Sequence, residues 1–156
     1  MPHLGPETPA RCILAAIPEK ILVAVSGSPL DTEIVHFACY QAKRAHGKMY
    51  AVYVIEVKRE LPLEVDLPAE VEKGEEILQQ AEEVARHWKQ DMETEVLQAR
   101  DAGTAIVEEA ERRGVDLVVV GLRYRKKFDQ FYVGSTVSHV LKNTPCRVTV
   151  CREPIP

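Results

Sequence analysis

The sequence contains no long apolar run, and this excludes a broad class of protein. Nowhere in its 156 residues is there a stretch near the roughly 20 consecutive apolar residues that a membrane-spanning helix needs. The apolar segment from Cys12 to Ile17 is too short for the hydrophobic region of a secretory signal peptide, and only Glu7 and Arg11 are charged upstream of it. We therefore expect no membrane association and a cytoplasmic location.

Cysteine is scarce and is not arranged as metal ligands usually are. The chain shows no C-x-x-C pair and no histidine at ligand spacing from any of its four cysteines, Cys12, Cys39, Cys146 and Cys151. Cys39 falls in a predicted helix, and Cys146 and Cys151 fall in a predicted strand. We expect buried free thiols, with a disulfide or a metal role as the less favoured alternative.

Recognisable catalytic motifs are also missing. The segment Ser26-Gly27-Ser28 lacks the Gly-x-Ser-x-Gly pattern of a nucleophile elbow. His139 has no cysteine or carboxylate at ligand spacing, and Asp116 and Glu108 have no evident partner for acid–base chemistry. The sequence predicts no catalytic residue, no metal site and a protein that is not an enzyme.

The charge is nearly balanced. A net charge of -4, with 46% hydrophobic and 28% charged residues, is typical of a soluble globular domain. This balance argues against DNA or RNA as a partner, although a local cluster of cations can still bind an anion. Such a cluster is present between Arg123 and Lys127.

Short apolar segments alternate with amphipathic ones along most of the chain. Strands are predicted at residues 21–25, 50–57, 93–99, 115–120 and 147–151, and helices at 32–46, 69–90, 103–114 and 135–142. The connections are too long for hairpins, so we predict a parallel sheet with right-handed crossovers and helices on both faces. Residues 1–18 are proline-rich and lack periodicity, which indicates a loose leader before a single domain at 19–156.

Helix boundaries are predicted from capping residues. We expect Asp31 or Thr32 to cap the first helix and Gly47 to follow its last turn. The third helix is expected to begin at Gly103-Thr104.

The segment from Asp116 to Val150 carries the clearest functional pattern. An apolar run leads to Gly121, a cationic loop follows, and a helix is predicted to begin at Gly134-Ser135-Thr136. Free N–H groups in the first turn of a helix and the helix dipole both favour a bound anion. The alternatives are an ordinary helix cap and a solvated basic loop. Because ligands of open α/β sheets bind beyond the carboxyl ends of the strands, residues 121–134 should share a crevice with residues 26–29.

Four stretches carry a family resemblance. They are VAVSGSP, YVIEV, AGTAIVEEAERRGVDLVVVG and GSTVSHVLKNTPCRVTV, and through them nearly all of residues 20–151 resembles the universal stress protein family. Nucleotide-binding members have a glycine, two residues, a second glycine, nine residues, and then Gly-Ser or Gly-Thr. Here Gly121 and Gly134-Ser135 match the first and last positions, but Tyr124 stands at the middle one. Ser26 also stands where those members usually have aspartate.

The resemblance implies a fold and a ligand. The fold is a three-layer α/β/α architecture with an open parallel five-stranded sheet, Rossmann-like or adenine nucleotide alpha hydrolase-like, of strand order 3-2-1-4-5. The ligand is ATP or a related adenine nucleotide, with Mg²⁺ as a further expectation. The protein would act as a stress-response or signalling module through nucleotide occupancy, and slow ATP hydrolysis stays open.

The resemblance also implies a set of site residues. The positions that line the nucleotide site are Ala24, Ser26, Val54, Val120, Gly121, Arg123, Gly134, Ser135 and Thr136. Arg125 and Lys126 are candidate phosphate contacts, because cationic side chains can supply part of what backbone amides supply in glycine-rich relatives.

The last predicted strand, residues 147–151, is expected at an exposed edge of the sheet. Exposed edges invite pairing with another chain, and members of the family commonly dimerise through this strand. We therefore expect a two-fold homodimer. The alternative function is a nucleotide-free dimeric interaction or regulatory protein of the same fold.

Overall fold

All five strands of the main sheet run parallel, as the alternation of segments predicts. The computed structural model describes residues 18–156, and its main sheet has the order β3-β2-β1-β4-β7. The strands are β1 (Lys20–Val25), β2 (Lys48–Glu56), β3 (Met92–Ala99), β4 (Leu117–Leu122) and β7 (Arg147–Arg152). Since β7 is the fifth strand of this sheet along the chain, the predicted order 3-2-1-4-5 is confirmed. Residues 1–17 of the predicted leader lie outside the described residues.

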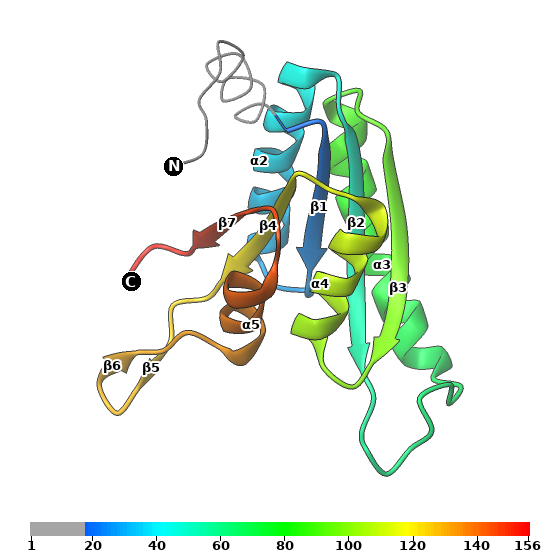
Figure 1. Cartoon of the computed structure of the whole chain (residues 1–156), viewed down its shortest axis with the longest axis vertical. Coiled ribbons are helices and arrows are strands. Elements are labelled where there is room, and N and C mark those ends of the chain that lie inside the picture. The colour runs from blue at the N-terminus through cyan, green and yellow to red at the C-terminus, as the bar shows by residue number, and fades with distance from the viewer. Residues whose placement is uncertain (1–17) are drawn as a thin grey trace, which may run out of the picture.

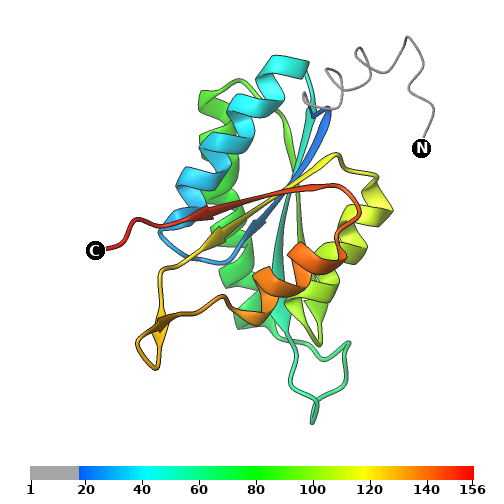
Figure 2. The same cartoon turned by 60° about the vertical axis from the view of Figure 1, so that its left-hand side comes forward.

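Within residues 18–156, two helices cover each face of the sheet (Figures 1 and 2). Helices α2 (Leu30–Ala45) and α3 (Pro68–His87) pack on one face, and α4 (Ala102–Arg113) and α5 (Ser135–Asn143) pack on the other. The arrangement is the predicted three-layer α/β/α fold.

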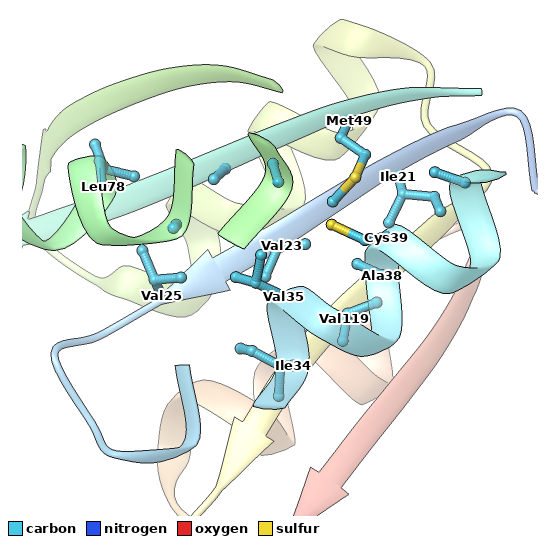
Figure 3. Packing of buried hydrophobic residues seen from close by; sticks show 14 of the residues in the cluster. Ile21, Val23, Val25, Ile34, Val35, Ala38, Cys39, Met49, Leu78 and Val119 are labelled. Carbon is cyan, nitrogen blue, oxygen red and sulfur yellow. The ribbon is translucent and has the colours of Figure 1, made fainter. Parts of the chain in front are cut away.

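The two layers of core follow from the alternation of side chains along each strand. On β1, Ile21, Val23 and Val25 point toward α2 and α3, whereas Leu22 and Ala24 point toward α4 and α5. Figure 3 shows the first of these layers, in which side chains from helix and sheet interdigitate. Because central parallel strands are buried on both faces, β1 and β4 are nearly continuous apolar runs.

Helix ends depart from the predicted caps. Helix α2 begins at Leu30 after Pro29, so neither Asp31 nor Thr32 is its N-cap. The Asp31 carboxylate lies within the first turn and accepts hydrogen bonds from N–H groups of the preceding loop.

At the other end of α2, the left-handed residue is His46, with φ 50°, and not Gly47. Gly47 is needed for another reason, because a Cβ there would lie 2.5 Å from the carbonyl oxygen of Glu19. Helix α4 begins one residue earlier than predicted and is capped by Asp101, whose carboxylate accepts from the Thr104 N–H at 2.8 Å.

A small hairpin interrupts the long connection between β4 and α5, where a loop was predicted. It consists of β5 (Lys126–Lys127) and β6 (Gln130–Phe131), and it projects from the body of the molecule (Figures 1 and 2). The two residues of its turn, Phe128 and Asp129, have φ of 53° and 59°. Positive φ at both positions is the geometry of a type I′ turn, which usually carries Asn-Gly, so the pair Phe128-Asp129 does not by itself predict a hairpin.

The described cysteines agree in part with the prediction of buried thiols. Cys39 is fully buried, but Cys146 lies before β7 and Cys146 and Cys151 are only half-buried. Cys12 lies outside the described residues. Within residues 18–156, no group of three or more His, Cys, Asp or Glu side chains is placed to hold a metal ion, and no helix is long and apolar enough to cross a membrane.

Candidate functional site

A cavity of about 350 Å³ opens at the carboxyl ends of β1, β2 and β4, on the side of the sheet that α4 and α5 cover. Its size is within the range of small-molecule sites, about 300 to 1,000 Å³. The order of strands reverses between β1 and β4, and ligands of open α/β sheets bind beyond that point. The cavity therefore lies where the fold favours a ligand.

Most of the residues predicted for the site line this cavity. They come from three strands and from the segment that leads into α5, and they are Ala24, Ser26, Val54, Val120, Gly121, Arg123, Arg125, Gly134 and Thr136. Ser135 and Lys126 are not part of the lining. Both are exposed, and Lys126 belongs to the projecting hairpin. Of residues 26–29, which we expected to share one crevice with residues 121–134, Ser26 lines this cavity, whereas Gly27, Ser28 and Pro29 line a separate depression beside α3.

Other lining residues were not predicted. Val52, Ile106 and Val137 complete an apolar wall, and Tyr132 and Glu56 lie at the polar margin. Alternation along β2 places Val52 on the same face as Val54, so that residue was within reach of sequence reasoning. Tyr132 was not, since its position depends on the unpredicted hairpin.

Helices α2, α3, α4 and α5 all follow strands and begin at the carboxyl edge of the sheet, and acidic side chains lie at the N-termini of α2, α3 (Glu70) and α4. The first turn of α2 carries Asp31 and Glu33. The Asp31 carboxylate accepts hydrogen bonds from the N–H groups of Ser26 (3.1 Å) and Gly27 (2.7 Å). Burial raises the pKa of the Asp31 carboxyl, and these two hydrogen bonds counteract that effect. An anionic ligand at this loop would meet negative charge and N–H groups that already have an acceptor.

The N-terminus of α4 is filled in a similar way. The Asp101 carboxylate accepts from the backbone N–H of Thr104 at 2.8 Å and from its hydroxyl at 2.9 Å. These hydrogen bonds are the main reason why the pKa of the Asp101 carboxyl is lowered. A second anion would meet the negative charge of the Asp101 carboxylate at that position.

The N-terminus of α5 is different. Its N-cap is Gly134, which has no side chain, and its first turn contains no acidic residue; within residues 18–156 no side chain caps it. Arg123 and Arg125 line the same cavity, while Glu56 is the single carboxylate side chain in the described lining. The positive end of a helix dipole and two guanidinium groups therefore face one space.

The glycines of the predicted motif are not required by backbone strain. Neither Gly121 nor Gly134 has a positive φ. A Cβ at Gly134 would meet no atom within 4 Å, and one at Gly121 would meet Leu30 at 3.4 Å, an ordinary contact. Tyr124, at the middle glycine position, is likewise free of positive φ. The open space beside Gly134 is therefore room for a ligand at the helix N-terminus.

The fold and the site together define a doubly wound α/β protein with an open helix N-terminus at the switch point of its sheet. The sequence model of the universal stress protein family matches residues 18–152. The chain therefore belongs to the universal stress protein family.

Known relatives agree with this assignment. The chain is 32% identical over 146 residues to a universal stress protein of Methanocaldococcus jannaschii, with 87% of this chain and 83% of the relative covered. It is similar in structure to the universal stress protein of Archaeoglobus fulgidus in complex with dAMP, with a TM-score of 0.68, 20% identity, and 86% and 98% of the two chains covered. A universal stress protein in complex with cAMP gives a TM-score of 0.67 at 19% identity, with 87% and 98% covered.

Proposed function

We propose that this protein binds ATP or a related adenine nucleotide and acts as a stress-response or signalling module through the occupancy of that site. The observation that carries the proposal is the cavity itself, which joins an apolar wall to the open N-terminus of α5 and to Arg123 and Arg125. An apolar wall fits a base, and a helix N-terminus with guanidinium groups fits phosphate. Family members of the same fold bind dAMP and cAMP, which supports an adenine nucleotide as the ligand.

We propose a position in the cavity for each part of the nucleotide. The base packs between Val54 and Val120, and the Ser26 hydroxyl contacts the nucleoside. The phosphates bind the N–H groups at Gly134 to Thr136. Mg²⁺ arrives with the phosphates, because Glu56 is the single carboxylate in the described lining and cannot by itself form a cation site.

The mechanism is a shift of conformation rather than a reaction. A nucleotide that binds the ordered loop better than other loop conformations increases the population of the ordered one. We propose that this change, and not rapid turnover, is what a partner detects in the cytoplasm.

We also propose a homodimer. Strand β7 forms one edge of the sheet, and its pairing with β4 leaves its other side without a neighbouring strand in the described chain. A second copy that pairs along residues 147–151 would satisfy this edge. A nucleotide-free dimeric interaction protein is the second candidate function, and Ser26 favours it, because a hydroxyl cannot provide the anionic anchor of aspartate.

Isothermal titration of the purified protein with Mg-ATP tests the proposal. We expect binding in the wild type and a dissociation constant at least about tenfold higher in Gly134→Val, whose Cβ would meet no protein atom within 4 Å. Arg125→Ala should also weaken binding, whereas Lys126→Ala, one residue away but outside the cavity, should not. Absence of binding at millimolar nucleotide would favour the interaction protein.

A further inference from the structure

Glu153, which directly follows β7, forms hydrogen bonds with the residues on both sides of Arg123 in the cationic loop. The backbone N–H of Glu153 donates to the carbonyl oxygen of Leu122 at 3.0 Å. In return, the Glu153 carboxylate accepts a hydrogen bond from the N–H of Tyr124 at 2.7 Å. Arg123 lies between these two attachment points, so its backbone is held from both sides.

Aromatic rings extend this attachment into the hairpin. The rings of Tyr124 and Phe131 are stacked, with centroids 5.6 Å apart and an angle of 11° between planes. The Arg152 guanidinium lies 5.5 Å from the first centroid and 5.9 Å from the second. We call Tyr124, Phe131, Arg152 and Glu153 the clasp.

The clasp lies next to the cationic residues that line the cavity. Arg125 follows Tyr124 directly, and its carbonyl oxygen accepts a hydrogen bond from the N–H of Tyr132 at 2.9 Å. Arg123, Arg125 and Tyr132 line the cavity, whereas the tip residue Phe128 is 89% exposed and does not. Without the clasp, the hairpin has no other described attachment that would keep its base against the cavity.

We propose that the clasp positions Arg123 and Arg125 for the phosphates of the nucleotide. The inference rests on the proposed function, and it assigns Tyr124, Arg152 and Glu153 as positioning residues that contact the loop and not the ligand. It also gives a physical role to tyrosine at a motif position where glycine could not stack. The side chain fixes a loop whose ordering would otherwise cost conformational entropy when the phosphates bind.

The proposal has a consequence for the sheet edge. Arg152 is the last residue of β7, and Glu153 follows it. A second chain that orders β7 would therefore also order the phosphate loop, so that pairing at the edge and binding at the cavity favour each other.

The first experiment that tests the proposal uses the protein without ligand. Amide hydrogen exchange is measured on wild type and on Glu153→Ala, with Glu153→Gln as the conservative variant, since its amide oxygen still accepts the Tyr124 N–H. We expect exchange at Tyr124 and across residues 125–132 to become at least about tenfold faster in Glu153→Ala and to stay near the wild-type rate in Glu153→Gln. The amides of Ser26 and Gly27, which Asp31 holds, should not change.

The second experiment measures the dissociation constants of the protein for ADP and for adenosine. In Glu153→Ala and Arg152→Ala we expect ADP to bind about tenfold more weakly and adenosine to bind as in the wild type, because the base and sugar do not contact the clasp. Arg44→Ala is the matched control, since Arg44 is an exposed arginine in the last turn of α2, outside the cavity, the clasp and the sheet edge. It should leave both constants unchanged.

These two experiments distinguish failure of the clasp proposal from failure of the proposed nucleotide function. If exchange across residues 125–132 is unchanged in Glu153→Ala, or if ADP and adenosine weaken equally, the clasp does not position the phosphate loop. If the wild type binds neither ligand while exchange still rises in Glu153→Ala, the proposed nucleotide function fails and the clasp stands as the attachment of the hairpin.

Discussion

Asp31 and Asp101 are both aspartates near the start of a helix, yet they act on different backbone groups. Asp101 precedes its helix and caps it, whereas Asp31 lies inside the first turn of α2 and binds the N–H groups of the loop before it. We predicted Asp31 or Thr32 as the cap of the first helix and did not predict Asp101 as the cap of α4. Helix α2 begins at Leu30 and α4 at Ala102, both earlier than predicted, and capping preferences alone do not resolve shifts of one or two residues.

Removal of the Asp101 cap should destabilise the protein. Asp101→Ala is expected to lower the free energy of unfolding by about 1 kcal/mol at pH 7, with Asp101→Asn close to wild type. Hydrogen bonds from Thr104 hold the folded pKa of Asp101 below its ordinary 3.8. The stabilisation is therefore present above that value and disappears as the pH falls through the lower folded pKa. Urea denaturation at pH 7 and pH 3 measures both effects, and an equal difference at both pH values would contradict them.

Cys39 should be inert in the folded protein. Its side chain is fully buried, and burial raises the pKa of its thiol to about 11. On the order of 0.1% would be thiolate at pH 8, and the thiolate is the nucleophile that attacks alkylating reagents. Mass spectrometry after iodoacetamide treatment at pH 8 should find Cys146 and Cys151 modified well before Cys39. Rapid modification of Cys39 without denaturant would contradict this packing.

At the scale of elements, an ion network joins α4 to the edge strand β3. Glu109 is 5% exposed and accepts hydrogen bonds from Arg112 and, at 2.5 Å, from Arg113. Arg113 also binds Glu95 at 2.9 Å and Glu93 at 3.1 Å. Burial would raise the pKa of the Glu109 carboxyl, but the two arginines hold it below its ordinary value.

Loss of Glu109 should loosen this contact between helix and strand. Glu109→Ala is expected to lower the free energy of unfolding by about 1.5 to 3 kcal/mol, because hydrogen bonds between charged groups are lost. Glu108→Ala, at the exposed neighbouring position, is the matched control and should change stability by less than about 0.5 kcal/mol. Equal effects of the two substitutions in chemical denaturation would show that the network contributes nothing.

The elements themselves were largely predictable, and the exceptions have physical causes. The runs 21–25 and 117–120 are apolar because parallel central strands are buried on both faces, and helical stripes recur at three and four residues. The hairpin at 126–131 could not be predicted, because strands of two residues leave no periodicity and Phe128-Asp129 is an unusual turn pair. For the same reason Tyr132 was missed among the cavity residues, while those at strand ends were found.

For the whole molecule, we expect two copies of the chain to associate through β7. Analytical ultracentrifugation at tens of micromolar should give twice the 17.5 kDa mass of one chain. Amides of residues 147–152 on the side away from β4 should be protected from hydrogen exchange, because pairing would occupy them. A mass of one chain at this concentration would contradict the dimer and leave the nucleotide site unaffected.

The central claim is that phosphate binds the open N-terminus of α5, while acidic side chains occupy those of α2 and α4. The most direct measurement compares backbone amide chemical shifts of the labelled protein saturated with ADP and with adenosine. We expect the difference in amide chemical shift between the ADP-saturated and adenosine-saturated protein to be largest at Gly134, Ser135 and Thr136. No shift with ADP at millimolar concentration, or a phosphate-dependent shift elsewhere but not at these three amides, would contradict it.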